Sequence, residues 1–425
     1  MTPPPKPVPF EPPPHAPETE AVYRELRERA PVLPITLPDG LTTWVITRYA
    51  DGKRALKDPR FIKDPRALRD PQHGFGGVRH PEDLMIVGGR HMLNSDAEEH
   101  ARLRGVATTV LSARAMARRE PEITTIAHRL LDRAVQDRRA PHVGPAAEPA
   151  VDLMQAYAQP LPETALGRVL GMSDAATAEA AAHMRRVISR DHPLSPPWQR
   201  AYADLTDVLR DALATPQNSD DGDTVIAALQ AAVAEGRLTR REVLSTVSIM
   251  FAGGISSTAI AIGHGAATLM QTTSVLRGLL DDEERATVVV EELLRHHAPF
   301  PFSPWRFARE PVEIAGTVVP EGAVVFIMLA ATNRDPDLYD APDTVIPERP
   351  DAPPHLAFGH GPHFCIGAHL ARIEIRVALR VLFQRFPGIV PAVPYSDVIW
   401  KGVLFDRTPV ALPVLLAGHP GPPPE

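Results

Sequence analysis

The single cysteine is the residue of this chain with the most distinctive chemistry. Cys365 lies in the segment FGHGPHFCIG (358–367), directly before a predicted helix. Backbone N–H groups and the dipole at a helix start stabilise a thiolate and tune its electron donation to a metal. Gly359, Gly361 and Gly367 let the backbone turn tightly and approach a flat ligand closely. The segment is therefore suited to hold a metal-bound sulfur.

Two other interpretations of this cysteine are open from the residues alone. A lone cysteine is most often an inert small hydrophobe in a core. His360, His363 and His369 flank Cys365 and suggest zinc. Structural zinc, however, usually draws its ligands from two separated pairs, and this cluster holds only one sulfur.

Charged side chains at helical spacing form two further candidate groups. Glu292 and Arg295 are spaced i, i+3, so both lie on one helix face and can pair. His100 and Arg104 are spaced i, i+4 behind Asp96, a candidate helix N-cap. Either group could equally be a solvated charged face, where an exposed ion pair contributes ~0–1 kcal/mol.

The cysteine segment resembles the heme-binding loop of the cytochrome P450 family. The motif positions that match are Phe358, Gly359, Gly361, His363, Cys365 and Gly367. The segments EELLRHHAP (291–299), ATNRDP (331–336) and PERP (347–350) also resemble the family, in the expected order. The resemblance covers almost the whole chain beyond about residue 17.

The resemblance implies a heme b cofactor whose iron takes Cys365 as its fifth ligand, the charge of the sulfur favouring O–O cleavage. It also implies that Phe358 packs beside the sulfur. His100, Arg104, Arg306 and His363 are implied as donors to the heme propionates, which would be costly to bury without partners. Glu292, Arg295 and Arg349 are implied to clamp the region behind the loop; if buried, loss of one partner costs roughly 3–5 kcal/mol.

The segment FAGGISSTAIAIGHG (251–265) departs from the family, whose pattern has an acid followed by a threonine that relay protons to oxygen. In the most direct register Ser256 replaces the acid, Ser257 replaces the threonine, and Thr258 follows. A register one residue different assigns the alcohol role to Ser256 or Thr258. A serine keeps the hydroxyl donor. Without the acid, proton delivery depends on water, on substrate hydroxyls or on another residue, and uncoupling to peroxide is favoured. The small residues also permit simple close packing.

The elements that position these residues are mostly helices. Helical spacing runs from Glu18 to Pro31, through most of the stretch 97–292, and over about 368–386. TTWVITRY (42–49), VEIAGTVV (312–319) and GAVVFIML (322–329) read as strands. We therefore expect a mainly α (α+β) cytochrome P450 fold, with one large helical domain over 18–425 and small sheets. Residues 1–17 are predicted to be a proline-rich, weakly ordered arm.

Composition sets broader limits. The formal net charge of −7 disfavours a nucleic-acid-binding protein. One cysteine excludes an internal disulfide and fits a reducing compartment. The N-terminal segment MTPPPKPVPFEPPPH has neither a signal peptide pattern nor a run near 18 apolar residues. We expect a cytoplasmic monomer that binds neither nucleic acid nor membrane.

The predicted function is a heme-dependent monooxygenase that inserts one oxygen atom from O2 into a small organic substrate, by hydroxylation or a related oxidation, in secondary metabolism. A hydrogen-peroxide-driven peroxygenase and a non-catalytic heme-binding sensor are the alternatives. No flavin or nicotinamide fingerprint is present, so electrons must come from an external ferredoxin and its reductase. We expect the ferredoxin to dock beside Cys365 on Arg102, Arg114 and Arg372.

The substrate walls are predicted from the family layout. They comprise 74–90, 193–198, 249–257, 300–304 and 403–405. Ile249, Phe300, Phe302 and Leu404 would make the cavity favour an apolar or amphipathic ligand.

Overall fold

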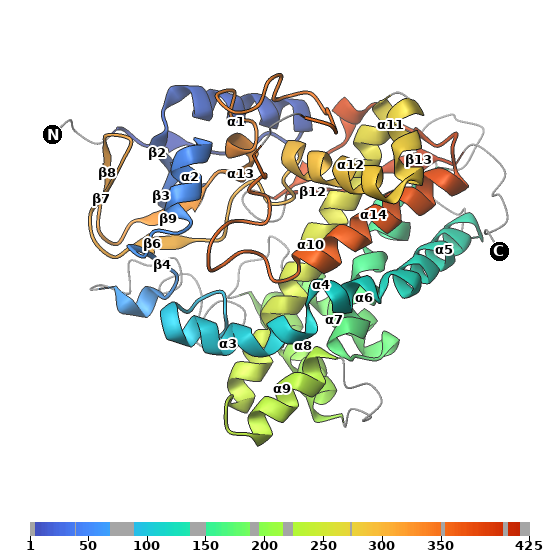
Figure 1. Cartoon of the computed structure of the whole chain (residues 1–425), viewed down its shortest axis with the longest axis horizontal. Coiled ribbons are helices and arrows are strands. Elements are labelled where there is room, and N and C mark those ends of the chain that lie inside the picture. The colour runs from blue at the N-terminus through green and yellow to red at the C-terminus, as the bar shows by residue number, and fades with distance from the viewer. Residues whose placement is uncertain are drawn as a thin grey trace.

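A long central helix organises the molecule. In the computed structural model, helix α10 (Arg240–Gln271) runs through the middle of the fold (Figure 1). The side chain of Thr239 accepts a hydrogen bond from the Glu242 N–H, and the Glu242 side chain accepts from the Thr239 N–H. This capping box fixes the start of the helix. The structure describes residues 5–38, 40–68, 89–136, 150–187, 195–215, 224–272, 274–349, 353–402 and 407–416.

The other helices surround α10 and bury apolar faces against one another. Helices α5 (Glu120–Gln136), α6 (Pro160–Leu170), α12 (Glu283–His296) and α14 (Ala368–Arg385) form the core bundle with it. The longer outer helices are α1 (Ala16–Arg29), α3 (Ala97–Val110), α7 (Asp174–Val187), α8 (Pro196–Ala214) and α9 (Val225–Ala234). The short helices are α2 (Tyr49–Ala55), α4 (Ala113–Ala117), α11 (Ser274–Gly278) and α13 (Leu329–Thr332).

One six-stranded sheet lies at the left of Figure 1, and the bundle lies to its right. Its order is β1 (Val8–Pro9), β2 (Val32–Thr36), β3 (Thr42–Ile46), β9 (Val324–Ile327), β6 (Arg306–Ala308) and β4 (Phe61–Ile62). The remaining strands form small sheets: β7 (Val312–Ile314) with β8 (Thr317–Val319); β10 (Val390–Pro391), β13 (Pro413–Leu415) and β5 (Val151–Asp152); and β11 (Trp400–Lys401) with β12 (Thr408–Pro409). The mainly helical fold with small sheets is confirmed.

The sheet joins segments that are far apart in the sequence. Strand β3 pairs with β9 in parallel, with Trp44 opposite Val325. Strand β6, which carries Arg306, pairs with both β9 and β4. Within the stretch expected to be a weakly ordered arm, β1 pairs with β2 and Phe10 is buried in the core.

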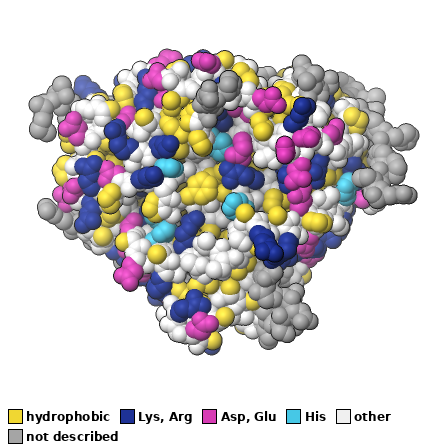
Figure 2. All heavy atoms as spheres, in the orientation of Figure 1, with side chains coloured by type: hydrophobic (Ala, Val, Ile, Leu, Met, Phe, Trp, Pro, Cys, Tyr) yellow, Lys and Arg dark blue, Asp and Glu magenta, His cyan; other side chains and the backbone are white. Residues whose placement is uncertain are grey.

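Helix α10 is also long and apolar enough to cross a membrane by length and composition. Of its most apolar window, 67% is buried inside the fold, as in the core helix of a globular protein. On the surface, Figure 2 shows Lys and Arg side chains interspersed with Asp and Glu over the face that carries α3 and α14. This face therefore carries no block of a single sign of charge.

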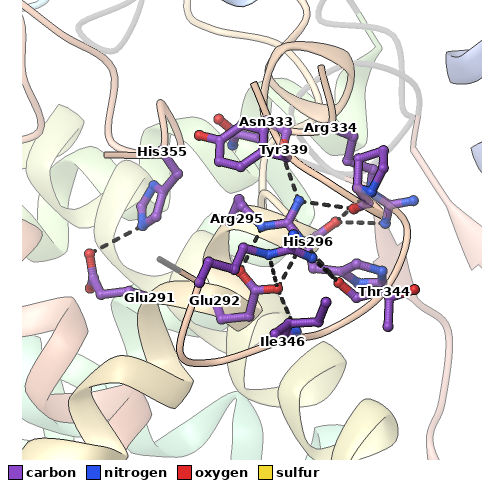
Figure 3. A network of polar contacts seen from close by, with 12 residues as sticks. Glu291, Glu292, Arg295, His296, Asn333, Arg334, Tyr339, Thr344, Ile346 and His355 are labelled. Carbon is purple, nitrogen blue, oxygen red and sulfur yellow. Dashed lines mark hydrogen bonds and ion pairs between the residues drawn. The ribbon is translucent and has the colours of Figure 1, made fainter. Parts of the chain in front are cut away.

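A buried charged network ties α12 to the loop that follows α13 (Figure 3). Arg295 donates to Glu292 at 2.6 Å and 2.8 Å, and Arg349 Nε donates to Glu292 Oε1 at 3.0 Å. The Glu292 and Arg295 side chains are 4% and 3% exposed. Burial alone would raise the pKa of Glu292, but the hydrogen bonds from Arg295 and the Ile346 N–H outweigh it and lower that pKa. The expected three-residue cluster is therefore complete and buried.

Candidate active site

The cysteine loop is a succession of tight turns held by its own backbone. Gly359 and Gly361 have φ values of 72° and 78°, in the left-handed region that favours glycine. The Cys365 N–H donates to the Phe358 carbonyl at 2.9 Å, which closes the loop. A Cβ at position 361 would lie 3.0 Å from the Leu56 carbonyl oxygen, so this position also needs glycine for space. The loop thus presents Cys365 three residues before α14 begins.

The surroundings of the sulfur pull its ionisation in two directions. Burial raises the pKa of the Cys365 thiol, and the Gly367 N–H, Arg104 and Arg372 oppose that rise. Arg372 also lies 4.4 Å from the centre of the Phe358 ring. The net pKa is raised, so a cation bound at the sulfur is what would keep it a thiolate.

Cys365 opens into a largely apolar cavity between the loop, α10 and the start of β6. The apolar lining includes Met92, Leu93, Leu166, Ile249, Met250, Leu294, Pro299 and Phe300. Of the expected site residues, the lining includes Arg104, Ser257, Thr258, Arg306, Phe358, Gly359, His363, Cys365 and Gly367. Ser256 is outside this lining, and so is His100, whose ring lies 4.2 Å from that of His363.

Positive charge is concentrated in one wall of the cavity. Lys63 is 1% exposed and Arg306 is 3% exposed. Their side chains donate hydrogen bonds to backbone carbonyls, from Lys63 Nζ to Trp305 at 2.7 Å and from Arg306 to Pro304 at 3.3 Å. Burial lowers the pKa of Arg306 to about 10 and that of Lys63 well below its usual value. This wall is therefore electrostatically suited to an anion.

The nearby carboxylate is already engaged. Asp96 occupies the N-cap position of α3, but its side chain makes no cap hydrogen bond, contrary to the sequence expectation. It accepts instead from the backbone N–H groups of Lys63 at 2.9 Å and Asp64 at 3.0 Å. His100 Nε2 is buried without a hydrogen-bond partner. Burial, together with Lys63, lowers the pKa of His363, so that side chain is neutral in this environment.

The small residues of α10 divide between packing and the cavity. A Cβ at Gly254 would lie 2.6 Å from Leu166, so this glycine allows α6 to pack closely. A Cβ at Gly253 would meet nothing within 4 Å. Ser257 donates its hydroxyl hydrogen bond to the Gly253 carbonyl at 2.7 Å. The close-packing interpretation therefore applies to Gly254, and Gly253 leaves open space at the wall.

Among the ionisable residues of the lining, sequence reasoning missed two, Lys63 and Glu374. Glu374 is 2% exposed on α14. Its spacing of four from Leu370 and Ala378, both buried, places it on the apolar stripe of that helix. A carboxylate on the apolar stripe of a helix could have been recognised in the sequence as a candidate buried acid. Lys63 is buried by strands that are distant in the sequence, so no local pattern predicted its burial.

The cavity lining agrees with some of the residues predicted to form the substrate walls and excludes others. Ile249, Phe300, Ser303 and Pro304 line the cavity as expected. Phe302 does not, because its ring packs edge-on against Phe10 and Phe326 in the core beside the sheet. The segments 74–88, 193–194 and 403–405, with Leu404, lie outside the described residues.

Two of the three arginines expected to attract a ferredoxin are paired within the chain. Arg372 donates to Glu291 at 2.7 Å and 2.9 Å, and Arg102 donates to Glu242 at 2.5 Å. Arg114 lies on α4, which packs against α14.

Comparison with known proteins decides the family. The cytochrome P450 family model matches residues 284–397. Cytochrome P450 107B1 of Saccharopolyspora erythraea is 32% identical over 92% of this chain and 93% of its own length. The 6-deoxyerythronolide B hydroxylase of the same organism is 31% identical over 93% and 95%. The chain belongs to the cytochrome P450 family.

The fold agrees with solved cytochrome P450 structures. The tirandamycin C-bound P450 monooxygenase TamI superposes with a TM-score of 0.81 at 30% identity, covering 96% of this chain and 100% of that one. This protein is accordingly a cytochrome P450 monooxygenase. The family implies a heme-thiolate cofactor, and the cavity fits one. Cys365 offers the sulfur, and the cationic wall with the unpartnered His100 Nε2 suits two carboxylates.

Proposed function

We propose that this cytochrome P450 holds heme b through Cys365 and oxidises an apolar organic substrate, by hydroxylation or a related reaction. The observation that carries the proposal is the cavity in which the only cysteine of the chain lies together with Lys63, Arg104 and Arg306. When bound, the heme would supply the redox centre at which O2, two electrons and two protons yield one inserted oxygen atom and water.

The residues of the loop and the cationic wall have distinct roles in this proposal. Cys365 donates its sulfur to iron, and Phe358 packs beside it under Arg372. Arg104, Arg306, His100 and His363 bind the propionates as donors, with Lys63 as an additional cation. His363 can donate a ring N–H to a propionate in either its neutral or its protonated form.

The substrate is proposed to be an apolar product of secondary metabolism. The substrate-facing side chains, such as Ile249, Met250 and Phe300, offer no charge. In support, two relatives are named for the hydroxylation of 6-deoxyerythronolide B and for the hydroxylation and epoxidation of mycinamicin IV. These two relatives are 31% identical to the chain.

Electrons are proposed to come from an acidic ferredoxin and its reductase, with the protein acting as a cytoplasmic monomer. The docking face is that of Cys365. Because Arg102 and Arg372 are paired with Glu242 and Glu291, the unpaired charge available there is smaller than the sequence suggested. Ferredoxin docking then depends on several moderate contacts rather than on one strongly positive electrostatic field.

A peroxygenase is the second candidate, favoured by Ser256 in the position of the family's acid.

Both functions are tested by turnover under ¹⁸O2 with a plant-type ferredoxin, its reductase, NADPH and a panel of apolar macrolactones. The monooxygenase proposal expects products that carry one ¹⁸O atom. Products formed only when hydrogen peroxide replaces the electron donors would contradict it and support the peroxygenase. A Cys365→Ala variant is the control and should form no product.

A further inference from the structure

Two stacked histidines lie on the segments that form the wall of the cavity. His264 is on α10, about one turn beyond Ala261, which lines the cavity. His297 follows the end of α12, between Leu294 and Pro299, which also line it. The rings of His264 and His297 have centres 4.5 Å apart and planes inclined by 20°. The stack therefore starts at the backbone segments that enclose the proposed heme site.

The stack continues to two aromatic residues near the C-terminal end of the chain. The ring centres of His264 and Trp400, on β11, are 4.1 Å apart, and the planes are inclined by 24°. Tyr395 lies edge-on to Trp400, with ring centres 6.1 Å apart. The phenol oxygen of Tyr395 is 3.2 Å from His264 Nδ1. Trp400 and Tyr395 lie outside the cavity lining, so the rings lead away from the cavity.

Trp400 and Tyr395 belong to side-chain types that lose an electron readily, but their surroundings differ. Trp400 is 4% exposed, and its indole N–H is buried without a hydrogen-bond partner. An oxidised Trp400 therefore has no acceptor for its proton among the described residues and stays a cation. Tyr395 is partly exposed and its hydroxyl faces the ring nitrogen of His264. The phenol can therefore lose an electron and a proton together, and its ring is within reach of a dissolved reductant.

The ionisation of the pair agrees with this geometry. Burial raises the pKa of Tyr395, so the phenol holds its proton at neutral pH. Burial, together with the nearby Arg334, lowers the pKa of His264 to about 3. The His264 imidazole is therefore neutral and keeps one ring nitrogen free to accept a proton.

We propose that Trp400 and Tyr395 carry oxidising equivalents out of the cavity when no substrate consumes them, with His264 as the proton acceptor. The inference rests on the proposed function, because the oxidising centre is the heme held by Cys365 after reaction with a peroxide. This route would protect the cavity from oxidation.

The electrons and protons of this route balance. In each event Trp400 gives one electron to the oxidised centre and regains one from Tyr395, whose phenol proton moves to His264 Nδ1. A dissolved one-electron reductant such as ascorbate then returns an electron to Tyr395, which recovers its proton from His264. Two such events consume both oxidising equivalents of one hydrogen peroxide, whose oxygen atoms leave as two waters with two protons from solvent.

A purely structural role for these rings makes a different prediction. Trp400→Phe and Tyr395→Phe keep an aromatic ring for packing but remove the readily oxidised group. Trp400→Phe leaves no hydrogen-bond partner unpaired, because the indole N–H has none. His264→Gln keeps an acceptor for the phenol but has no basic nitrogen. If the rings only pack, none of the three variants should change the fate of the oxidising equivalents.

The experiment compares wild type and the three variants as ferric holoenzymes, with Tyr157→Phe as the matched control. Tyr157 is a buried tyrosine whose phenol donates to the Ala378 carbonyl at 2.8 Å and not to a basic nitrogen. Each protein is mixed with hydrogen peroxide without organic substrate and freeze-quenched. Electron paramagnetic resonance then measures the protein radicals, and ring-deuterated tyrosine identifies a tyrosyl signal. The second readout is the rate at which peroxide bleaches the heme, with and without ascorbate.

We expect a tyrosyl radical in wild type and in Tyr157→Phe that is lost in Tyr395→Phe and reduced in Trp400→Phe and His264→Gln. The heme should bleach faster in these last three variants, and ascorbate should slow bleaching more in wild type than in them. A tyrosyl signal in Tyr395→Phe equal to that of wild type, or no tyrosyl radical in wild type while its heme reacts with peroxide, would overturn the proposal. Failure of the proposed function is recognised separately, because wild type would then lack thiolate-ligated heme before any peroxide is added.

Discussion

At the scale of single residues, the cationic wall of the cavity, formed by Lys63 and Arg306, carries buried positive charge. A bound dianion would compensate this charge. Lys63 and Arg306 are buried, and within the described part of the chain their side chains donate hydrogen bonds to backbone carbonyls. Burial without a carboxylate partner lowers the pKa of Lys63, which means that the charged form is disfavoured in the folded protein. The same side chain should therefore weaken the apoprotein and strengthen the loaded protein.

We predict opposite effects of Lys63→Met on these two forms. The free energy of unfolding of the apoprotein, measured in urea at pH 7, should rise by about 1 kcal/mol or more because an unfavourable buried charge is removed. Heme affinity, measured by transfer to apomyoglobin, should fall about tenfold or more because a charged donor to a propionate is lost. The exposed Lys401→Met is the matched control. A rise in both quantities would contradict a role for Lys63 at the cofactor.

The sequence identified one part of the site well and missed another. Cys365, Phe358 and the loop glycines could be predicted because their roles depend on a short contiguous segment. Lys63 could not be assigned in the same way, because its burial comes from packing between segments far apart in the chain. Glu374 could have been found from its place on the apolar stripe of α14. Ser256 was named with Ser257 and Thr258, but the helical turn directs it away from the cavity lining.

At the scale of elements, two adjacent glycines of α10 should differ in their tolerance to a methyl group. Gly254→Ala places a Cβ 2.6 Å from a terminal methyl group of Leu166, so the buried Leu166 side chain or α6 must move, at a cost of about 1–3 kcal/mol. Gly253→Ala meets no atom within 4 Å and replaces glycine within a helix, so stability should be equal or higher. Urea unfolding of both apoproteins measures the difference. Equal destabilisation of the two would contradict the packing assigned to α6 and α10.

The contact between α12 and α14 should depend on pH. Burial alone would raise the pKa of Glu291, but the hydrogen bonds from Arg372 and the close contact with His355, at 3.2 Å, outweigh it and lower the pKa to about 2. A carboxylate with a depressed folded pKa stabilises the fold above its unfolded pKa of about 4.5, and the contribution is lost as pH falls toward 2.

The matching variant is Glu291→Gln. Since the Glu291 side chain is 35% exposed, solvent screening limits the expected loss to about 1 kcal/mol at pH 6. The difference in unfolding free energy between wild type and variant should shrink steadily as pH is lowered from 5 to about 3. A difference that is constant across this range would show that the pairing of Glu291 with Arg372 contributes nothing through ionisation.

At the scale of the whole molecule, helical periodicity was sufficient to predict a mainly helical fold. It placed the helix over 368–386 within one residue of α14 (Ala368–Arg385). It did not supply the sheet order, in which β3 lies beside β9 and β6 lies beside β4. Those pairings join strands more than 200 residues apart, and no local pattern encodes them. They bring Lys63, next to β4, against Arg306 on β6 and thereby complete the cationic wall.

We propose that this fold assembles a heme-thiolate site around Cys365. The most direct test is the absorption spectrum of the purified, dithionite-reduced protein under carbon monoxide, with Cys365→Ala measured beside it. We expect a strongly red-shifted Soret band in the wild type that is lost in the variant. Absence of bound heme, or a band at the position typical of histidine-ligated hemes, would contradict it.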